Sequence, residues 1–431
     1  MLQQALIIII ITRFYQWRVE ASQRLLNDKD KTALTSLSFN KLSIFKTSGD
    51  AKFRPSPPEI GRSSFKQKLD HFNTKNGQTW RQYYMHRKSP YQNPDGPVFL
   101  MIGGEDQADR AWLTNYNLPY LQLADQINAS TYMLEHRFYG ASRPTKNTSL
   151  QNLKYLNAKQ AIEDIHHFVQ EINQREGLSN PKWIAFGGSY SGSLAAWIRQ
   201  KYPQDIRASV ASSAPLQAKL NFQEFEEQIK KIIEKKDEKC VAVIQKLFQK
   251  MREMSETNEG RKDLVRIFRL DKSLNQPSVS QKDIANFFLV ITNYISFIIM
   301  HSGINVKGHR DLLTLDTMCK KLTNSPLLES IRGLISMVMI SQGKLPQSAL
   351  DIGYKSFVDF MRDERWNTAS SQPRAWLYQN CNEFGHFRTS EKPDGLFGGT
   401  LPLKYDLQTF CIYKYIYILI ILKFSLIYIY E

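Results

Sequence analysis

The sequence predicts an α/β protein, and three observations support this fold class. Short apolar runs typical of buried strands alternate with helical patterns between residues 79 and 197. One of these runs leads directly into a turn rich in glycine and serine, and then into a helical pattern that ends before Pro203. The chain has 431 residues, which is more than a single core usually supports, so we expect a main α/β domain with an insertion.

The strands and one helix of this domain can be placed in order along the chain. Strands are predicted at three apolar runs, Val98 to Ile102, Tyr132 to Leu134 and Trp183 to Phe186, the last of which is typical of a buried parallel strand, and a further strand is predicted at Ala208 to Ala211. Residues 158–172 predict an amphipathic helix, because their apolar residues recur at steps of three and four and form one stripe.

The pattern changes after Pro215. Apolar residues then follow helical spacing with no intervening strand, as in the series Phe222, Phe225, Ile229, Ile232 and Ile233. We therefore expect a helical insertion over residues 216–373, between a first part of the α/β domain at 64–215 and a return to it at 374–411.

The turn Gly187-Gly188-Ser189-Tyr190-Ser191 carries the strongest functional signal. A serine between a strand and a helix adopts a strained backbone that exposes its hydroxyl, and the helix start behind it offers N–H groups to a developing oxyanion. Tyr190 would supply the first such N–H. The general pattern G-x-S-x-G has glycine where this chain has Ser191. From these five residues alone, a nucleophile and a structural turn are equally supported.

A second oxyanion donor would come from the turn Gly103-Gly104-Glu105, which follows an earlier predicted strand. Gly104 is our candidate, and a plain structural turn explains the same residues equally well. His136 follows another strand and precedes Ser189, so we expect it to satisfy a local hydrogen bond rather than to act as the catalytic base.

Composition argues against several classes of partner. The net charge is +16, but lysines and arginines are scattered among acids, as between Glu224 and Lys239, which indicates a solvated surface rather than a nucleic-acid site. No glycine-rich phosphate loop and no C-x-x-C spacing occur, and His166 and His167 would point apart on a helix. We therefore expect no nucleic acid, cofactor or metal.

Four cysteines suggest two disulfides in an oxidising compartment. They are Cys240, Cys319, Cys381 and Cys411. Three pairings exist, and we favour Cys240 with Cys319 inside the insertion and Cys381 with Cys411 outside it. Four unpaired buried thiols are the alternative.

Two sequons agree with a secreted route: Asn128-Ala129-Ser130 and Asn147-Thr148-Ser149. Asn128 directly precedes a predicted strand, so Asn147 is the better glycosylation candidate.

Several motifs in a fixed order resemble one peptidase family, which groups prolyl carboxypeptidase, dipeptidyl peptidase II and thymus-specific serine protease. The matching segments are Leu69-Asp70-His71-Phe72-Asn73, Thr79-Trp80-Arg81-Gln82-Tyr83-Tyr84, Pro97-Val98-Phe99-Leu100-Met101-Ile102-Gly103-Gly104-Glu105, Glu135-His136-Arg137-Phe138-Tyr139-Gly140, the Ser189 turn, and Tyr378-Gln379-Asn380-Cys381-Asn382-Glu383-Phe384-Gly385. The resemblance covers roughly residues 64–411 and is nearest to the thymus-specific branch.

This resemblance implies an α/β-hydrolase sheet, a helical insertion that caps the active site, and Ser189 as the nucleophile. It also implies peptide substrates with proline near the cleaved bond, in the secretory pathway or the lysosome. A homodimer and the end from which peptides are trimmed are left open.

The base and the acid of the expected triad are not found. In α/β-hydrolases they follow the serine in the order Asp, then His. After Ser189 the chain has only His301, His309 and His386, and none lies in a matching motif. The family's Asp-Pro-Trp and Ala-His-Cys motifs would lie beyond Cys411. We therefore expect a truncated sheet and no triad Asp or His in this chain, with a rate loss of roughly 10⁴ to 10⁶.

Both ends of the chain are unusual. Residues 1–63 contain a poor signal-like apolar run and have no counterpart in the family, so a wrongly assigned start is one explanation. Residues 412–431 are almost only Ile, Tyr, Leu, Phe and Lys, which indicates a gene-prediction artefact, with a membrane segment as the alternative.

The sequence therefore predicts a serine exopeptidase, either a proline-preferring carboxypeptidase or a dipeptidyl peptidase, incomplete and inactive as written. The alternative is a truncated pseudoenzyme that binds peptides or a partner and is membrane-attached only if the C-terminal tail is real. A lipase or esterase would use the same turn but lacks the ordered motifs.

Overall fold

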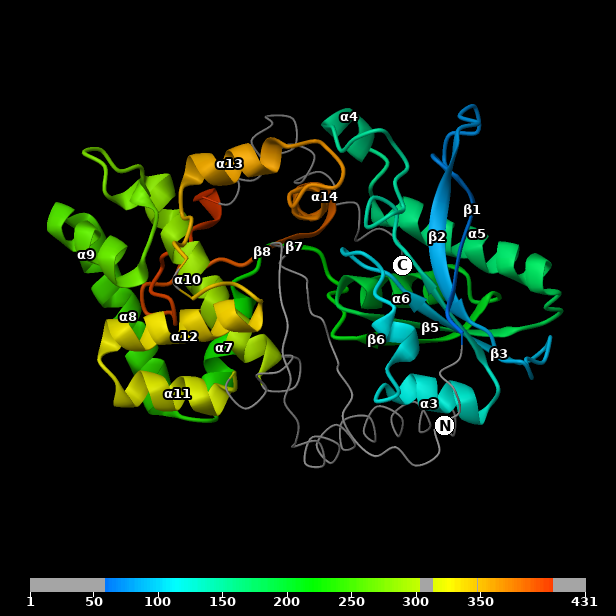
Figure 1. Ribbon diagram of the computed structural model, residues 1–431, viewed down its shortest axis with the longest axis horizontal. Coiled ribbons are helices and arrows are strands. Elements are labelled where there is room, and N and C mark those ends of the chain that lie inside the picture. The colour runs from blue at the N-terminus through cyan, green and yellow to red at the C-terminus, as the bar shows by residue number, and fades with distance from the viewer. Residues whose placement is uncertain (1–58, 303–312, 347, 406–431) are drawn as a thin grey trace. The chain divides into compact units, whose positions relative to one another are not determined.

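The structure is a computed structural model that describes residues 59–302, 313–346 and 348–405 (Figure 1). The described residues form two compact units that are discontinuous in sequence. The first comprises residues 59–144 and 161–214, and the second comprises residues 145–160 and 215–405.

A six-stranded mixed sheet forms the first unit (Figure 1). Its strands are β1 (Gly61–Lys68), β2 (Thr79–Arg87), β3 (Pro97–Ile102), β4 (Ser130–Leu134), β5 (Lys182–Gly188) and β6 (Ile206–Ser212), in the order β1-β2-β4-β3-β5-β6. Strands β3 to β6 run parallel, and β2 is antiparallel to both β1 and β4. This confirms the α/β class and all four predicted strands.

The helices of this unit follow the sequence pattern. They are α2 (Ala111–Thr114), α3 (Pro119–Gln126), α5 (Ala158–Glu176), which begins in the second unit, and α6 (Tyr190–Lys201). The predicted helix at 158–172 is confirmed. Its apolar stripe is buried, and Phe168 packs edge-on against Tyr132 of β4 and Trp183 of β5.

A buried ion pair connects three parts of the first unit. The Arg137 guanidinium, just after β4, donates two hydrogen bonds of 2.6 Å to the carboxylate of Asp164 on α5. Arg137 also donates to the carbonyl of Leu69, and His71 Nε2 lies 2.8 Å from Asp164 Oδ1. The segment after β1 is therefore the third part that this ion pair connects. Burial alone would raise the pKa of Asp164, but Arg137 and the hydrogen bonds lower it overall.

Within the described residues the second unit is mainly helical (Figure 1). Its helices are α4 (Leu150–Leu153), α7 (Glu224–Glu234), α8 (Glu238–Glu256), α9 (Asn258–Phe268), α10 (Gln281–His301), α11 (Leu315–Asn324), α12 (Leu327–Ser341), α13 (Tyr354–Arg362) and α14 (Ser371–Gln379), with a short 3₁₀ turn (Lys272–Leu274) and a π turn (Asn380–Phe384). Two short parallel strands, β7 (Lys219–Asn221) and β8 (Gly385–Phe387), also belong to it.

The core of the second unit lies among α8, α10, α11 and α12. Phe248, Phe287 and Ile335 are fully buried there. Helix α10 is long and apolar enough to cross a membrane by composition, but its Phe287, Ile291 and Ile295 are buried in this core, so we interpret it as a core helix. A disulfide joins Cys240 of α8 to Cys319 of α11, with their Cα atoms 5.2 Å apart.

Replacing Asp164 by Asn should lower the free energy of unfolding by about 3–5 kcal/mol at pH 7, because Arg137 would stay buried without a charged partner. The folded-state pKa of Asp164 is depressed, so its stabilisation is present above the unfolded pKa and is lost as pH falls through the folded value. Urea titrations at neutral and strongly acidic pH should show the wild type and the variant converging in acid. Glu171→Gln, which removes an exposed pair with Arg175 on the same helix, should change stability little.

The double substitution Cys240→Ala with Cys319→Ala should lower stability by about 2–5 kcal/mol, because the bridge closes a long loop in the unfolded chain. The two cysteines are 79 residues apart in sequence. Denaturant titrations under non-reducing conditions measure this loss. Equal stability of the double variant and the oxidised wild type would contradict a stabilising role for the bridge.

Candidate active site

Ser189 lies at a sharp turn between strand β5 and helix α6. Strand β5 ends at Gly188 and α6 begins at Tyr190, so Ser189 alone connects them. Its φ of 57° and ψ of −131° fall in a region that residues with a side chain rarely adopt. Ser189 is exposed, as a nucleophile must be.

Close backbone packing holds this turn in place. The N–H of Ser189 donates to the carbonyl of Ser212 at the end of β6, over 3.0 Å. A Cβ at Gly187 would lie 2.1 Å from the carbonyl oxygen of Ser191, so only glycine fits there. A Cβ at Gly192 would lie 3.1 Å from both Ala214 and Ser212, so α6 begins close to the segment that follows β6.

Ser191 explains the departure from the general G-x-S-x-G pattern. Its hydroxyl accepts a hydrogen bond from the N–H of Gly188 over 3.1 Å and donates one to the carbonyl of Gly188 over 2.9 Å. The side chain therefore ties the last residue of β5 to the first turn of α6. A glycine at 191 would give a tight turn without these two bonds.

The turn after β3 lies beside the start of α6. The N–H of Gly103 donates to the carbonyl of Leu134 over 2.8 Å, and a Cβ at Gly103 would approach that oxygen to 2.7 Å. A Cβ at Gly104 would make ordinary contact with Ser191, at 3.5 Å from its Cβ. The structure thus brings Gly104 and the Ser189 turn together, while the oxyanion roles of Tyr190 and Gly104 stay predictions.

His136 anchors the Tyr190 side chain. Its Nδ1 lies 2.6 Å from the carbonyl oxygen of Arg137, which only accepts, so Nδ1 carries the proton. Its Nε2 then accepts from the Tyr190 hydroxyl over 3.0 Å. Burial lowers the pKa of His136 to about 4, which keeps the ring neutral. The predicted local hydrogen bond is confirmed.

Glu135 organises the loops around this edge of the sheet and was not singled out in the sequence. Its carboxylate accepts from the N–H groups of Ala108 and Ala141, at 3.2 and 3.0 Å. Burial raises its pKa, and these hydrogen bonds oppose that rise. A Cβ at Gly140 would lie 2.0 Å from its Oε1. The sequence signal that could have identified Glu135 is an acidic residue directly after the buried strand β4.

The histidines that follow Ser189 in sequence make other contacts. His301 Nδ1 lies 2.8 Å from the carbonyl oxygen of Phe297 on α10, and His386 Nε2 lies 3.1 Å from that of Gln217. His309 lies outside the described residues. Within the described residues of the first unit, Ser189 has no hydrogen bond to a histidine.

The modification candidates have different surroundings. Cys381 is buried and disulfide-bonded, and its expected partner Cys411 lies outside the described residues. Asn128 is exposed with a φ of 56°. Asn147 is half-buried, and its Oδ1 accepts from the side chain of Asn152 over 2.7 Å. Glycosylation at either asparagine stays a prediction.

Comparisons with known proteins agree with one another. Residues 67–417 match the family described as Serine carboxypeptidase S28. A Caenorhabditis elegans protein whose name calls it a serine protease is 35% identical over 354 residues, which is 80% of this chain and 68% of that protein.

Two mammalian relatives are more distant. The Homo sapiens thymus-specific serine protease is 28% identical over 361 residues, which is 81% of this chain and 68% of that protein. The Mus musculus lysosomal Pro-X carboxypeptidase is 29% identical over 248 residues, which is 54% of this chain and 50% of that protein. Because these two identities are similar, the assignment of this chain to the thymus-specific branch stays a prediction.

Replacing Ser189 by Gly should stabilise the protein by about 1 kcal/mol, because glycine removes a backbone strain of about 1–3 kcal/mol and loses more entropy on folding. Ser189→Ala keeps the Cβ and should leave stability unchanged. Ser191→Ala should destabilise by about 0.5–1.5 kcal/mol, because it removes two hydrogen bonds to the backbone of the exposed Gly188. Thermal and urea unfolding would rank the three, and a Ser189→Gly variant less stable than Ser189→Ala would argue against strain.

The buried His136 should make the protein less stable in acid. Its folded-state pKa is about 4, below the usual 6.5, so its neutral form is favoured by folding. Stability from this residue is complete above pH about 6.5 and falls as pH drops toward about 4, by on the order of 3 kcal/mol. His136→Gln should flatten this part of the curve. An unchanged curve would mean that the pKa of His136 is the same in the folded and the unfolded chain.

Proposed function

The chain belongs to the serine carboxypeptidase S28 family, and from this premise we propose that it is a serine exopeptidase that uses Ser189 as its nucleophile. Members of this family are hydrolases that act on peptides. The geometry of Ser189 is the observation that supports the assignment: a strained, exposed serine between a parallel strand and a helix.

The surroundings of Ser189 suit acyl transfer. A hydroxyl that attacks a peptide carbonyl generates an oxyanion, and backbone N–H groups must stabilise it. The first N–H groups of a helix have no intrahelical acceptor, and Tyr190 opens α6 directly after Ser189. Gly104, which contacts the same first turn, would supply the second donor.

We extend the proposal to the substrate and the cellular location on the basis of a related protein. The name of the mouse relative, lysosomal Pro-X carboxypeptidase, states a proline next to the cleaved bond and a lysosomal location. For this chain we propose peptides with proline near that bond, met in the secretory pathway or the lysosome. The disulfide between Cys240 and Cys319 supports an oxidising route.

A second candidate is a protein of the same family that binds peptides without turnover. The observation that favours it is that Ser189 has no hydrogen bond to a histidine within the described residues of the first unit. A serine without a general base reacts slowly, because its hydroxyl stays protonated.

Labelling with a fluorophosphonate separates the two candidates. The peptidase predicts modification that Ser189→Ala abolishes and that Ser213→Ala preserves, since Ser213 is another exposed serine with positive φ in the same unit. Labelling that survives in Ser189→Ala would overturn the assignment of the nucleophile. Absent labelling together with saturable binding of a proline-containing peptide would support the binding protein.

Turnover of short peptides should depend on the same serine. We expect release of residues from one end of X-Pro peptides, detected by mass spectrometry, with a loss of about 10³-fold or more in Ser189→Ala. The masses released identify the end that is trimmed. Hydrolysis of fatty acyl esters without peptide hydrolysis would favour a lipase.

A further inference from the structure

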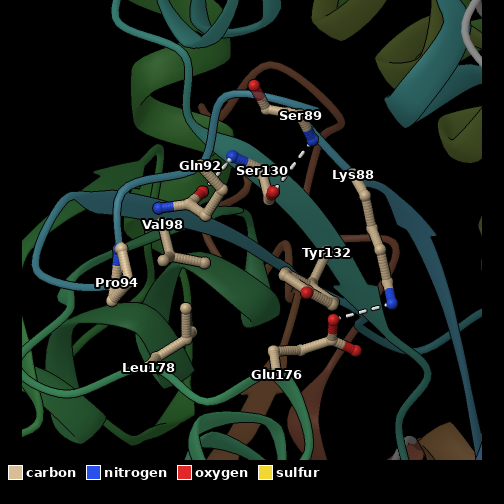
Figure 2. Close-up of a pocket in the computed structure, with 9 residues that line it drawn as sticks. All are labelled: Lys88, Ser89, Gln92, Pro94, Val98, Ser130, Tyr132, Glu176 and Leu178. Atoms are coloured by element: carbon tan, nitrogen blue, oxygen red, sulfur yellow. Dashed lines mark hydrogen bonds and ion pairs between the residues drawn. The ribbon is translucent and has the colours of Figure 1, made fainter.

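A small cavity lies at the opposite edge of the sheet from Ser189. It is bounded by Val98 near the start of β3, Ser130 at the start of β4 and Glu176 at the end of α5, whereas Ser189 follows the end of β5 (Figure 2). Its volume is about 110 Å³. All of its lining residues belong to the first unit, so the cavity is formed without the second.

The hydroxyl of a buried tyrosine opens into this cavity without a hydrogen bond to the described residues. Tyr132 is only 2% exposed, and its ring packs against Phe168 and Trp183. Its hydroxyl forms no hydrogen bond with any residue that the structure describes. Burial and the nearby Glu176 carboxylate raise its pKa, so the hydroxyl is neutral and able to donate. A hydroxyl that faces an accessible cavity can donate a hydrogen bond to a water or to a ligand there.

The charges at the cavity select the class of ligand. Lys88 and Glu176 form an ion pair of 2.7 Å on one side of it, with side chains 48% and 20% exposed (Figure 2). A lone carboxylate would be repelled by Glu176, and a lone ammonium by Lys88. A zwitterion presents one group to each partner, because the lysine ammonium has two further donors and the glutamate has a second oxygen.

The remaining polar lining is already engaged. The Ser130 hydroxyl accepts from the N–H of Ser89 over 2.9 Å, and the Gln92 Oε1 accepts from the N–H of Ser130 over 2.7 Å (Figure 2). The opposite side of the cavity is apolar, with Val98, Pro94 and Leu178. Tyr132, Lys88 and Glu176 can therefore recognise the polar atoms of a ligand, and the Ser130 hydroxyl keeps one proton to donate.

We propose that this cavity binds a free α-amino acid with a small apolar side chain. The carboxylate of the amino acid accepts from the ammonium of Lys88 and the hydroxyl of Tyr132. Its ammonium donates to Glu176, and its side chain contacts Val98 and Leu178. The site is separate from Ser189 and does not depend on catalysis at that residue.

Isothermal titration calorimetry of the full chain with L-valine tests the proposal. We expect saturable binding that weakens about tenfold in Tyr132→Phe and in Glu176→Gln, because each loses a hydrogen bond to a charged group. Tyr202→Phe is the matched control: its hydroxyl binds Glu163 elsewhere in the same unit, and its affinity should equal that of the wild type. N-acetyl-L-valine and L-valinamide, which each lack one charge, should bind at least tenfold more weakly.

Two further measurements keep the result interpretable. Without ligand, Tyr132→Phe should be about as stable as the wild type, because the hydroxyl that it removes forms no hydrogen bond with the described residues, so lost binding would not reflect unfolding. Ser189→Ala should bind L-valine normally, which separates this cavity from product binding at the active site. No saturable heat with L-valine, equal affinity in Tyr132→Phe, equal affinity for N-acetyl-L-valine, or lost binding in Ser189→Ala would each overturn the proposal.

Discussion

The buried ion pair between Arg137 and Asp164 fixes the end of strand β4, and the candidate site is built from that end. Arg137 is the last of three consecutive polar residues with different tasks. Glu135 holds the loops that contain Ala108 and Ala141, and His136 orients the side chain of Tyr190. If Arg137 lost its place, all three contacts would shift together, because they share one short stretch of backbone.

Parallel pairing supplies the second constraint on the site. Strands β3, β5 and β6 run in the same direction, so the turns that follow them meet at one edge of the sheet. Gly104 and Ser189 lie in the turns after β3 and β5, and Ser212 is the last residue of β6. The conformation of Ser189 is unfavourable on its own. It persists because close packing at Gly187 and hydrogen bonds made by Ser191 and Ser212 hold the surrounding backbone in place.

The sequence pattern predicted those features whose cause is local. Strands β3, β4 and β5 are largely buried apolar runs, whereas β6 has only Ile206 buried, and the Ser189 turn has its small residues at the required spacing. Strands β1 and β2 were missed because they are only partly buried and mix polar with apolar residues. Arg137 and Asp164 lie 27 residues apart, and charged residues are usually exposed. No local sequence pattern therefore predicted that they form a buried pair. In the sequence, Ser191 departs from the G-x-S-x-G pattern. In the structure, its two hydrogen bonds to Gly188 stabilise the turn.

The division of the chain between its two units bears on how it is synthesised. Residues 145–160 belong to the unit that otherwise starts at 215, so the chain leaves the first unit, returns to it within α5, and leaves again. While the ribosome is still translating, the sheet can assemble from residues up to 214, but the segment at 145–160 must wait for partners such as Glu364 and Glu383. During that interval the segment is open to chaperones and proteases, and its late docking would be a quality checkpoint in biogenesis.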